Sequence, residues 1–500
     1  MGGCVAAARA VDPTEVTSEA APGPGPRPPK CVAFQSSEPN GKYLCYARHG
    51  NGGAAAERLL RLDGEDVTSP HTRFFMEPSK EHHGLLHVRC CYDNKYWAAK
   101  ILQADDDEDG WFIGTIAEAE EDLSKTTCTL FKTTVGEGVP GYIRFVHARL
   151  DMYGCMSKRS PHFSLQKGGD EDAGGGYMII HDLSQQVVLP RYLAFKGDNG
   201  MYLCPRIIEH HEYLQFSARD VGQALVNRVH SNKDGTICIW SNHFGKFWRR
   251  SPNWIFCDSD DDGAACGDDV DTLFRAIRFR SFVALQSLGN NWYCNRLTTE
   301  GKKSCLNAGT PTITAEARLR PEEAVVSREI YDVVFDLSGP RVYGKTSVVD
   351  MAAASSHNDT ASSDTAQLKL ERRDTERRTW VSSVTVNLGV TAKIHAGVPH
   401  ITAGGNVEVT DEFSGSYSWG SSMEKQTTKD VAYQVTVPPK TRVTVTIVAT
   451  RAFCDVPFSY KQRDTLFDGQ QVTLDMNDGL YTGENCFDFE YVITSEEKES

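Results

Sequence analysis

The chain is 500 residues long, which is enough for about three ordinary domains. Acidic residues outnumber basic residues 67 to 53 and give a formal net charge of −14, so the chain lacks the excess of Lys and Arg that nucleic-acid binding requires. Hydrophobic residues make up 40% of the chain, yet no apolar run approaches the roughly 18 to 20 residues that a transmembrane helix needs. These figures favour a folded multidomain protein without membrane-spanning helices.

The N-terminal residues 1–29 end in the sequence APGPGPRPP, which supplies few backbone donors and little apolar surface. We therefore expect a disordered, Pro/Gly-rich leader. It lacks the basic and apolar regions of a secretory signal, so we expect the chain to be cytoplasmic or nuclear as synthesised and to reach a membrane only on insertion. Gly2 and Cys4 are the residues that dual acylation would modify, but Ala6 stands where the myristoylation pattern has Ser or Thr.

The 15 cysteines are an odd number and are scattered along the chain. Disulfide frameworks are typical of small secreted domains with regularly spaced cysteines, which this chain does not resemble. No CxxC pair is present, so no zinc site is expected. We predict mostly reduced thiols that pack as small apolar side chains.

Between residues 30 and 320 one pattern recurs six times. Each unit has a short apolar strand pattern, a turn rich in Gly, Asn or Asp, and a second strand pattern that begins near an aromatic residue, which is typical of a β-hairpin. The six units are CVAFQSSEPNGKYLC, HVRCCYDNKYWA, IRFVHARLDMYGC, YLAFKGDNGMYLC, TICIWSNHFGKFW and FVALQSLGNNWYC. The recurring aromatic residues are Tyr43, Tyr96, Tyr153, Tyr202, Phe247 and Trp292.

A Gly-rich segment, KGGDEDAGGG from Lys167 to Gly176, interrupts the series after its third unit. A single unit cannot bury its own apolar face, so the units must assemble. The spacing of about fifty residues is compatible with a six-bladed propeller, but three units on either side of an interruption fit two domains with threefold internal symmetry better. We predict an all-β protein with one β-trefoil over residues 30–176 and a second over residues 186–320.

The two predicted trefoils resemble the amaranthin-type agglutinin domains of plant lectins. The likeness rests on Asn94-Lys95-Tyr96-Trp97, which is followed by an acidic loop and Gly110-Trp111-Phe112-Ile113, and on Gly245-Lys246-Phe247-Trp248 and Asn253-Trp254-Ile255 in the second trefoil. The resemblance implies a shallow site for terminal galactose or N-acetylgalactosamine, completed by the second domain of a neighbouring subunit, and therefore a dimer. Gly245 and Phe247 replace the asparagine and tyrosine of the first turn, so the second turn departs from the sugar-binding pattern.

The first turn also has the chemistry of a sugar site. A sugar ring has an apolar C–H face and a rim of hydroxyl groups, so it requires an aromatic surface next to amide or carboxylate groups. Asn94, Tyr96 and Trp97 supply that mixture. Tyr96 can alternatively be a core residue, because it belongs to the recurring aromatic positions, and Trp97 is then the better ligand. The predicted carbohydrate-binding residues are Asn94, Tyr96, Trp97, Trp111 and Trp248.

Residues 326–500 form the third predicted domain and read as almost pure β-strand. From Val384 to Trp419 apolar and polar residues alternate, and the phase changes after Pro399 and His400. This pattern predicts one long amphipathic hairpin with its turn at residues 397–401. Its predicted membrane-facing residues are Val384, Val386, Leu388, Val390, Ile394, Val398, Ile401, Val407 and Val409.

The predicted hairpin satisfies the requirements of a membrane strand pair. A transmembrane β-strand needs roughly 9 to 11 alternating residues, and each half of this hairpin is longer. Phe413, Tyr417 and Trp419 lie at one end, where interfacial aromatic residues are expected. A soluble two-sheet sandwich with one buried face has the same alternation, so the pattern alone leaves both structures open.

The third domain looks like the aerolysin-type pore-forming modules, a group that includes epsilon-toxin and mosquitocidal toxins. The likeness rests on the hairpin and on VTVPPKTRVTV from Val435, in which a double proline separates two strands. Two agglutinin domains followed by such a module are the domain order of a group of plant chimaeric lectins. The resemblance implies a homo-oligomeric ring whose hairpins enter membrane lipid.

Two hypotheses follow. The first is a defence lectin that docks on glycans and forms oligomeric β-barrel pores, and the alternative is a cytosolic or nuclear defence or stress lectin that only binds glycans. A glycosidase requires two carboxylates that face each other across a cleft. No such pair can be assigned, so we expect no enzyme, no catalytic residue and no cofactor. The acidic run Asp258–Gly263 resembles the start of a calcium loop but lacks flanking helices, so no metal site is expected.

Overall fold

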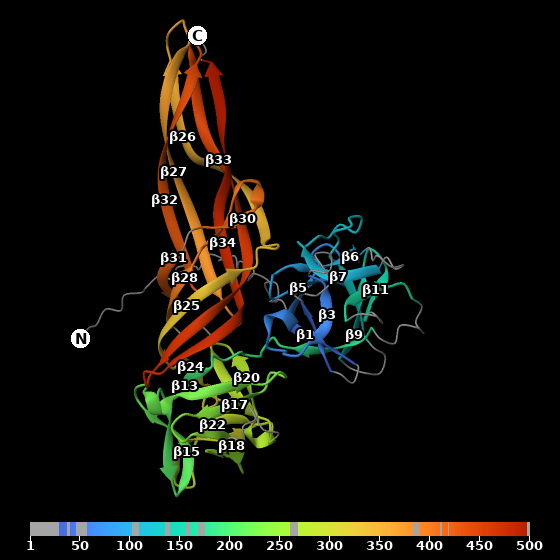
Figure 1. Cartoon of the computed structure of the whole chain (residues 1–500), viewed down its shortest axis with the longest axis vertical. Helices are drawn as coiled ribbons and strands as arrows, with labels where there is room; N and C mark the ends of the chain where they lie inside the picture. The colour runs from blue at the N-terminus through green and yellow to red at the C-terminus, as the bar shows by residue number, and fades with distance from the viewer. Residues whose placement is uncertain are drawn as a thin grey trace, which may run out of the picture.

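Strands make up almost all of the regular structure (Figure 1). The computed structural model describes residues 30–37, 41–46, 58–102, 110–135, 141–156, 161–168, 176–260, 269–383, 390–410, 413–418 and 420–497. Within this part of the chain the only helical elements are four short 3-10 helices, η1 (Pro70–Thr72), η2 (Gln223–Leu225), η3 (Val270–Thr272) and η4 (Ala403–Gly405), which confirms the predicted all-β class. None of the described helices has the length and apolar character needed to cross a bilayer.

The strands form three bodies, coloured blue to cyan, green, and yellow to red in Figure 1. We call them the first domain (residues 30–182), the second domain (residues 192–323) and the C-terminal module (residues 325–497). The C-terminal module is elongated and stands upright in this view. The second domain lies at its lower end, and the first domain lies beside its lower half (Figure 1).

Each of the first two domains is a twelve-stranded sheet in which all pairings are antiparallel. The first contains β1 (Lys30–Ser36), β2 (Tyr43–Tyr46), β3 (Leu60–Gly64), β4 (Phe74–Pro78), β5 (Leu85–Cys90), β6 (Tyr96–Leu102), β7 (Gly110–Ala117), β8 (Phe131–Val135), β9 (Tyr142–His147), β10 (Met152–Met156), β11 (Phe163–Gln166) and β12 (Met178–Asp182). The second contains β13 (Tyr192–Lys196), β14 (Tyr202–Ile208), β15 (His211–Ala218), β16 (Asn227–Ser231), β17 (Ile237–Ser241), β18 (Lys246–Ser251), β19 (Trp254–Ser259), β20 (Phe274–Phe279), β21 (Phe282–Ser287), β22 (Tyr293–Thr299), β23 (Lys302–Thr310) and β24 (Arg320–Glu323). The six predicted hairpins are confirmed as β1–β2, β5–β6, β9–β10, β13–β14, β17–β18 and β21–β22.

A fully buried tryptophan lies within the core of each domain. The ring centroid of Trp97 lies 5.1 to 6.1 Å from those of Phe145, Phe74, Phe34, Phe131 and Phe163. In the second domain Trp248 is equally buried, and its Nε1 donates to Asn227 Oδ1 at 3.2 Å. Successive side chains of a strand point to opposite sides, so the core position is the one after the recurring aromatic residue.

The C-terminal module is built on two very long strands. Its strands are β25 (Val325–Phe335), β26 (Arg341–Asn358), β27 (Asp364–Val381), β28 (Thr391–Ala396), β29 (Pro399–Ile401), β30 (Val407–Val409), β31 (Phe413–Ser418), β32 (Ser422–Val437), β33 (Thr441–Leu466) and β34 (Gln471–Glu497). The sheet order is β31-β28-β25-β33-β34-β27-β32, with β26 also paired to β33. Strand β33 has 26 residues, which corresponds to about 85 Å at roughly 3.3 Å per residue. Pro438 and Pro439 separate β32 from β33, as predicted.

The predicted amphipathic hairpin is present in the described residues, but its turn lies elsewhere. β28 pairs with β31, and β29 pairs with β30. The chain reverses at residues 402–406, where the Thr402 N–H donates to the Asn406 carbonyl at 2.8 Å. The predicted turn at residues 397–401 is wrong because Pro399–Ile401 forms a strand. Of the predicted hairpin residues, Val384, Val386, Leu388 and Trp419 lie outside the described residues.

A buried ionic triad joins the second domain to the C-terminal module. Arg328 Nε lies 2.7 Å from Asp464 Oδ1, and Arg328 Nη2 lies 2.7 Å from Glu323 Oε1. All three side chains are less than one-tenth exposed, so each charge depends on the others for its stabilisation. The first and second domains also touch directly, since the Val67 N–H donates to the Lys233 carbonyl at 2.8 Å.

The cysteines agree with the prediction except at one position. Twelve described cysteines are free, and all of them except Cys31 and Cys91 are buried. Burial and the neighbouring Asp63 raise the pKa of Cys45 to about 12, so this thiol stays neutral and packs as an apolar side chain. Cys238 differs because it is disulfide-bonded.

Candidate functional site

The turn between β5 and β6 carries the predicted sugar-binding residues. The buried Asp93 carboxylate fixes its shape, because Oδ1 accepts from the Lys95 N–H at 3.0 Å and Oδ2 accepts from the Thr115 hydroxyl at 2.9 Å. Asn94 has a φ of +56°, a left-handed conformation that Asn adopts more readily than most residues. The turn therefore presents the Asn94 side chain from a well-anchored backbone.

Asp93 should make the stability of the first domain depend on pH. Burial raises the pKa of Asp93 to about 6, because the Lys95 N–H and the Thr115 hydroxyl only partly offset the loss of solvation. Between the ordinary pKa of 3.8 and about 6 the unfolded state releases this proton before the folded state does, so this carboxyl destabilises the fold as pH rises. The loss is roughly 3 kcal/mol at most. Thermal unfolding of wild type and Asp93→Asn at pH 4 and pH 7 should show that the melting temperature of the variant rises relative to wild type at the higher pH. An equal difference in melting temperature at both pH values would contradict this expectation.

A chain of hydrogen bonds connects Asn94 to Tyr96. Arg89 Nη1 donates to Asn94 Oδ1 at 2.5 Å, and Arg89 Nε donates to Glu77 Oε1 at 2.8 Å. The Tyr96 hydroxyl donates to Glu77 Oε2 at 2.8 Å. Burial and the Glu77 carboxylate raise the pKa of Tyr96 to about 12, so the hydroxyl keeps its proton at neutral pH. The structure brings Asn94 and Tyr96 together, and the Tyr96 side chain is buried, with an exposed fraction of 8%.

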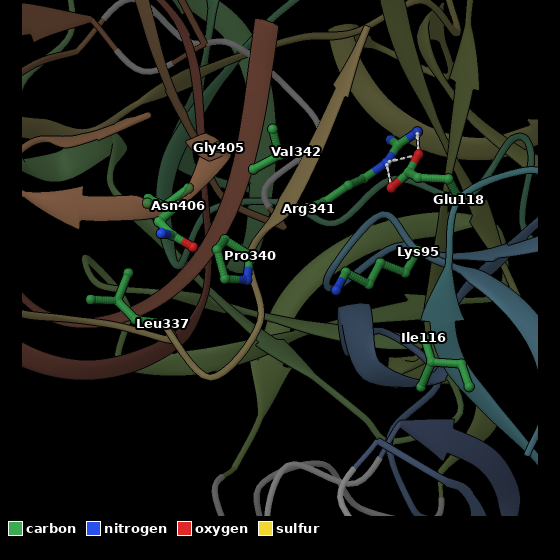
Figure 2. A pocket seen from close by; sticks show the side chains of 10 residues that line it. Lys95, Ile116, Glu118, Leu337, Pro340, Arg341, Val342, Gly405 and Asn406 are labelled. Carbon is green, nitrogen blue, oxygen red and sulfur yellow. Dashed lines mark hydrogen bonds and ion pairs between the residues drawn. The ribbon is translucent and has the colours of Figure 1, made fainter. Parts of the chain in front are cut away.

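This turn faces the C-terminal module. Asn94 Nδ2 donates to Asp455 Oδ2 of β33 at 3.1 Å, and the Arg341 guanidinium lies 5.6 Å from the centroid of the Tyr96 ring. Arg341 also forms an ion pair of 2.9 Å with Glu118 of the first domain (Figure 2). A ligand that uses the Asn94 amide must therefore replace the contact with Asp455.

A cavity of about 430 Å³ lies beside this contact. Figure 2 shows side chains that reach it from the first domain, from the segment after β25 and from the tip of the hairpin. The residues include Lys95, Glu118, Pro340, Arg341, Gly405 and Asn406. Burial lowers the pKa of Lys95. The predicted sugar turn and the hairpin tip thus border the same cavity.

The three predicted tryptophan ligands do not join this turn. Trp97 and Trp248 are fully buried in the cores of their domains, so neither side chain can contact a sugar and both predictions are wrong. Trp111 is half-buried and pairs with Ile101. Ile101 is five residues along β6 from Tyr96, or about 16 Å at roughly 3.3 Å per residue.

Replacing Trp97 should affect stability without affecting sugar binding. Trp97→Phe leaves a partly filled hole among the surrounding phenylalanines, and we expect it to destabilise the first domain by about 1–3 kcal/mol, less than the 3–5 kcal/mol of a change to Ala. Trp292→Phe is the matched control, because Trp292 is 41% exposed. Calorimetry should show a lower melting temperature for the Trp97 variant only. Glycan binding by the folded fraction should stay at the wild-type level. A binding defect in folded protein would restore Trp97 as a ligand.

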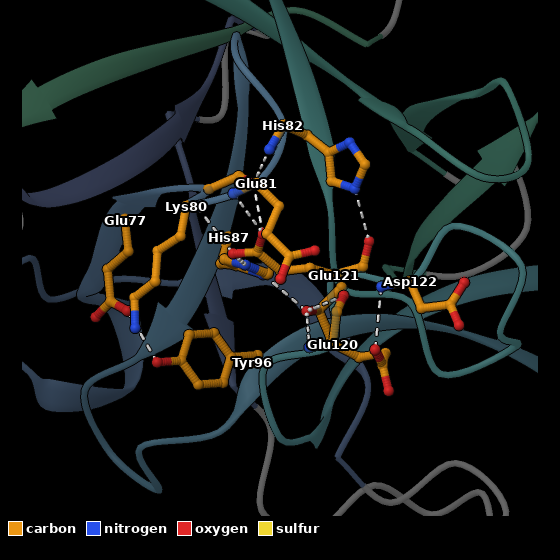
Figure 3. A network of polar contacts seen from close by, with 11 residues as sticks. Glu77, Lys80, Glu81, His82, His87, Tyr96, Glu120, Glu121 and Asp122 are labelled. Atoms are coloured by element: carbon orange, nitrogen blue, oxygen red, sulfur yellow. Dashed lines mark hydrogen bonds and ion pairs between the residues drawn. The ribbon is translucent and has the colours of Figure 1, made fainter.

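Glu121 organises a second polar cluster in the first domain (Figure 3). Its carboxylate accepts from the Lys80 N–H at 2.9 Å, the Glu81 N–H at 2.8 Å and the Ser79 hydroxyl at 2.9 Å, and His87 Nε2 lies 3.3 Å away. Desolvation opposes ionisation, but these donors outweigh it and lower the pKa of Glu121 to about 2. Such a carboxylate is a poor general acid or base near neutral pH, so we interpret the cluster as structural. No group of His, Cys, Asp or Glu residues in the described ranges is arranged to hold a metal ion.

The apolar residues in the middle of the hairpin are buried in the C-terminal module. The exposed fractions of Ile394, Val398 and Ile401 are 1%, 4% and 2%. These side chains share one core cluster with Trp380 and Phe458. Of the other predicted membrane-facing residues, Val390 and Val407 are half-buried and Val409 is exposed.

Among the described residues, polar contacts join the hairpin to β25 and β34; His395 Nε2 lies 3.3 Å from Glu329 Oε1 of β25. Asn485 of β34 accepts from the Ile401 N–H at 2.9 Å and donates to the Ile401 carbonyl at 2.8 Å, and Asp488 accepts from the Gly404 N–H at 3.0 Å. β28 pairs with β25 over three residues only, and β31 forms the edge of the sheet. The ladder between β33 and β34 therefore contains none of the described strands of the hairpin.

Comparison with known proteins identifies the first two domains. The Agglutinin domain model matches residues 28–157 and 187–319, which together are just over half of the chain. The chain belongs to the Agglutinin domain family. This confirms the resemblance inferred for the two predicted trefoils, and agglutinin domains are domains of carbohydrate-binding lectins. The search against curated proteins finds no match.

Several solved structures are similar to this chain. Lamprey immune protein has 12% identity and a TM-score of 0.29, and the match covers 73% of this chain and 90% of that chain. An aerolysin-like protein from Bombina maxima has 13% identity and a TM-score of 0.23, covering 34% and 99%. The parasporin-2 toxin of Bacillus thuringiensis has 16% identity and a TM-score of 0.21, covering 42% and 87%.

The sequence could have placed some of the residues around the turn between β5 and β6 but not others. Val88 and Cys90 are buried in β5, so strict alternation puts Arg89 on the outer face, next to the turn. Asp455 lies 361 residues from Asn94. No local pattern signals its contact with the first agglutinin domain.

Proposed function

We propose that this protein is a lectin for terminal galactose or N-acetylgalactosamine that forms oligomeric β-barrel pores in membranes. Membership of the Agglutinin domain family supports glycan binding, and the anchored turn carries the Asn94 amide and the Tyr96 ring. Tyr96 is 8% exposed and has Arg341 of the C-terminal module over its ring, so its use as a sugar surface also depends on separation of the two domains. Because Asn94 is hydrogen-bonded to Asp455, glycan binding there requires the first agglutinin domain to separate from the C-terminal module. The second agglutinin domain of a neighbouring chain then completes the site.

The hairpin from β28 to β31 carries the pore-forming half of the proposal. The module covers Ile394, Val398 and Ile401 on its apolar face. Among the described residues, three register pairs and a contact between His395 and Glu329 connect it to β25. Once released, that face would be exposed to water unless it entered lipid, which is the energetically favourable alternative. The alternation of apolar and polar residues would then direct one face to lipid and the other to an aqueous lumen.

Pore formation also requires several chains. A single hairpin would leave unpaired backbone N–H and C=O groups in the hydrocarbon layer, and only a closed barrel satisfies them all. Glycan binding raises the local concentration of chains on a surface. Neighbouring hairpins can then pair edge to edge in a homo-oligomeric ring.

Dye release from vesicles tests this function. Vesicles that carry a glycolipid with terminal galactose are loaded with a self-quenching dye and mixed with the full chain. We expect binding followed by dye release, and no release from vesicles of the same lipids without the glycolipid. Release that is independent of the glycolipid would contradict the lectin step.

The alternative function is a lectin that binds glycans and makes no pores. The paired hydrogen bonds between Asn485 and Ile401 favour it, because they satisfy a backbone amide and carbonyl that release of the hairpin would expose. This alternative predicts that wild type and Asn485→Ala both bind the vesicles and leave them sealed. Under the pore-forming function, Asn485→Ala should release dye faster than wild type.

A further inference from the structure

A second cavity, of about 500 Å³, lies between the second agglutinin domain and the turn that joins β33 to β34. This volume is within the range of small-ligand sites. The side chains that matter for its chemistry are Gln223, Arg228, Trp240 and Asn242 from the agglutinin domain, and Asp468 and Gln470 from the turn. An aromatic ring, amides and groups of both charges therefore meet in one place.

Trp240 supplies the aromatic surface. Its side chain is half-buried, and its ring packs edge-on against Phe247 with centroids 4.9 Å apart and an interplanar angle of 78°. The Arg228 guanidinium lies 5.6 Å from the Trp240 centroid. Phe247 and Arg228 thus hold the indole in place while part of it remains accessible. A fixed, partly exposed indole is a suitable surface for the C–H face of a sugar.

The amides that line the cavity are available to a ligand. Gln223, Asn242 and Gln470 are exposed, and none of their side chains forms a hydrogen bond within the described ranges of the chain. Each side-chain amide can both donate and accept, as sugar hydroxyl groups require. Arg228 Nε donates to His230 Nε2 at 2.9 Å, which orients the guanidinium.

Residues from the second domain's counterpart of the Asn94 turn, the turn between β5 and β6, line this cavity. The hairpin β17–β18 occupies the same place in its domain's repeat as β5–β6. Gly245 stands where the first turn has Asn94, which is why this turn departs from the expected sugar-binding pattern. Asn242 supplies an amide three residues earlier in the same turn, and unlike Asn94 it has no hydrogen bond to the C-terminal module among the described residues.

We infer that this cavity binds a neutral hexose or N-acetylhexosamine residue at the end of a glycan. Trp240 lies under the C–H face of the ring, and Asn242 and Gln223 bind its hydroxyl groups. Asp468, on the opposite wall, accepts hydrogen bonds from the sugar hydroxyl groups. Its negative charge and the positive charge of Arg228 offset each other, so the cavity favours a neutral sugar over one that carries a carboxylate. Since Asp468 and Gln470 belong to the C-terminal module, the bound sugar bridges the module and the second agglutinin domain. The inference rests on the proposed lectin function and adds a second site to it.

Calorimetric titration of the full chain with N-acetylgalactosamine, galactose and sialyllactose tests the site. The titrations use an Asn94→Ala background, so that the first turn does not contribute. We expect binding of the neutral sugars to persist in that background and to weaken at least fivefold in Asn242→Ala and in Asp468→Asn. Both residues are exposed, so these variants should fold, which their melting temperatures check. Trp292→Ala removes an exposed tryptophan of the same domain outside the cavity and should leave affinity unchanged.

The outcomes separate this inference from the function on which it rests. If wild type binds no sugar, the lectin function itself fails. If wild type binds but Asn94→Ala abolishes binding, or if Asn242→Ala and Asp468→Asn bind as tightly as Trp292→Ala, the second site is overturned and the lectin function stands. Tighter binding of sialyllactose than of the neutral sugars would overturn the assignment to neutral sugars.

Discussion

A disulfide between β25 and β28 is expected to abolish dye release while leaving glycan binding intact. Glu329 and Lys393 are register partners across the parallel ladder that holds the hairpin to the module. Neighbouring strands lie roughly 5 Å apart, within the Cα separation that a disulfide spans. Oxidised Glu329→Cys/Lys393→Cys should therefore keep the hairpin in place and bring release to the level of vesicles without protein. Reduction should restore it.

The matched control places the disulfide inside the hairpin. Lys393 and Ser416 are register partners of β28 and β31, and both side chains are exposed. Oxidised Lys393→Cys/Ser416→Cys joins the two strands of the hairpin but leaves it free to separate from β25, so release should continue. Normal release by the oxidised Glu329→Cys/Lys393→Cys protein would rule out this hairpin as the inserting element.

Loss of Arg328 is expected to lower the free energy of unfolding by about 3–5 kcal/mol, because Arg328→Ala leaves two buried carboxylates without their cation. Burial already raises the pKa of Glu323 against the opposing effect of Arg328. Without Arg328 the pKa of Glu323 rises further, and protonation at low pH relieves the repulsion from Asp464. The difference in the free energy of unfolding between wild type and Arg328→Ala should therefore be largest near neutral pH and shrink as the medium becomes acidic. Urea unfolding measured across this pH range checks both points.

An exposed arginine of the same module provides the comparison. Arg373 pairs with Glu371 at 3.0 Å, but its side chain is 75% exposed. Exposed pairs contribute less than about 1 kcal/mol, so Arg373→Ala should be close to wild type at every pH. Equal costs for Arg328→Ala and Arg373→Ala would mean that the buried triad does not stabilise the junction between the second agglutinin domain and the module.

The six hairpins and the all-β class could be predicted because both depend on short-range patterns. A turn rich in Gly, Asn or Asp between two alternating segments limits the chain to a few conformations within about fifteen residues. The double proline at Pro438 and Pro439 is equally local, since Pro cannot donate to a central strand ladder. It ends β32 and precedes β33, as expected.

The candidate site was harder to predict because neighbouring residues in a strand point to opposite sides. Tyr96 and Trp97 are both large and aromatic, so the sequence allows either one to enter the core. The structure packs Trp97 among five phenylalanine rings, whereas Tyr96, which is 8% exposed, donates to Glu77 outside that cluster. The same ambiguity affected Trp248. When both faces of a strand carry a large aromatic residue, the sequence does not show which face enters the core, and packing decides between them.

Strand periodicity, the repeats and the amphipathic character of the hairpin could therefore be predicted from the amino-acid pattern, since each is encoded in residues close together along the chain. What covers each face depends on how the domains and strands pack. This packing hydrogen-bonds the Asn94 turn to Asp455 and brings Trp240 next to the β33–β34 turn. It also buries the apolar residues in the middle of the hairpin against the module. These contacts join segments far apart in sequence, so they follow from how whole domains pack and leave no signal in any one segment.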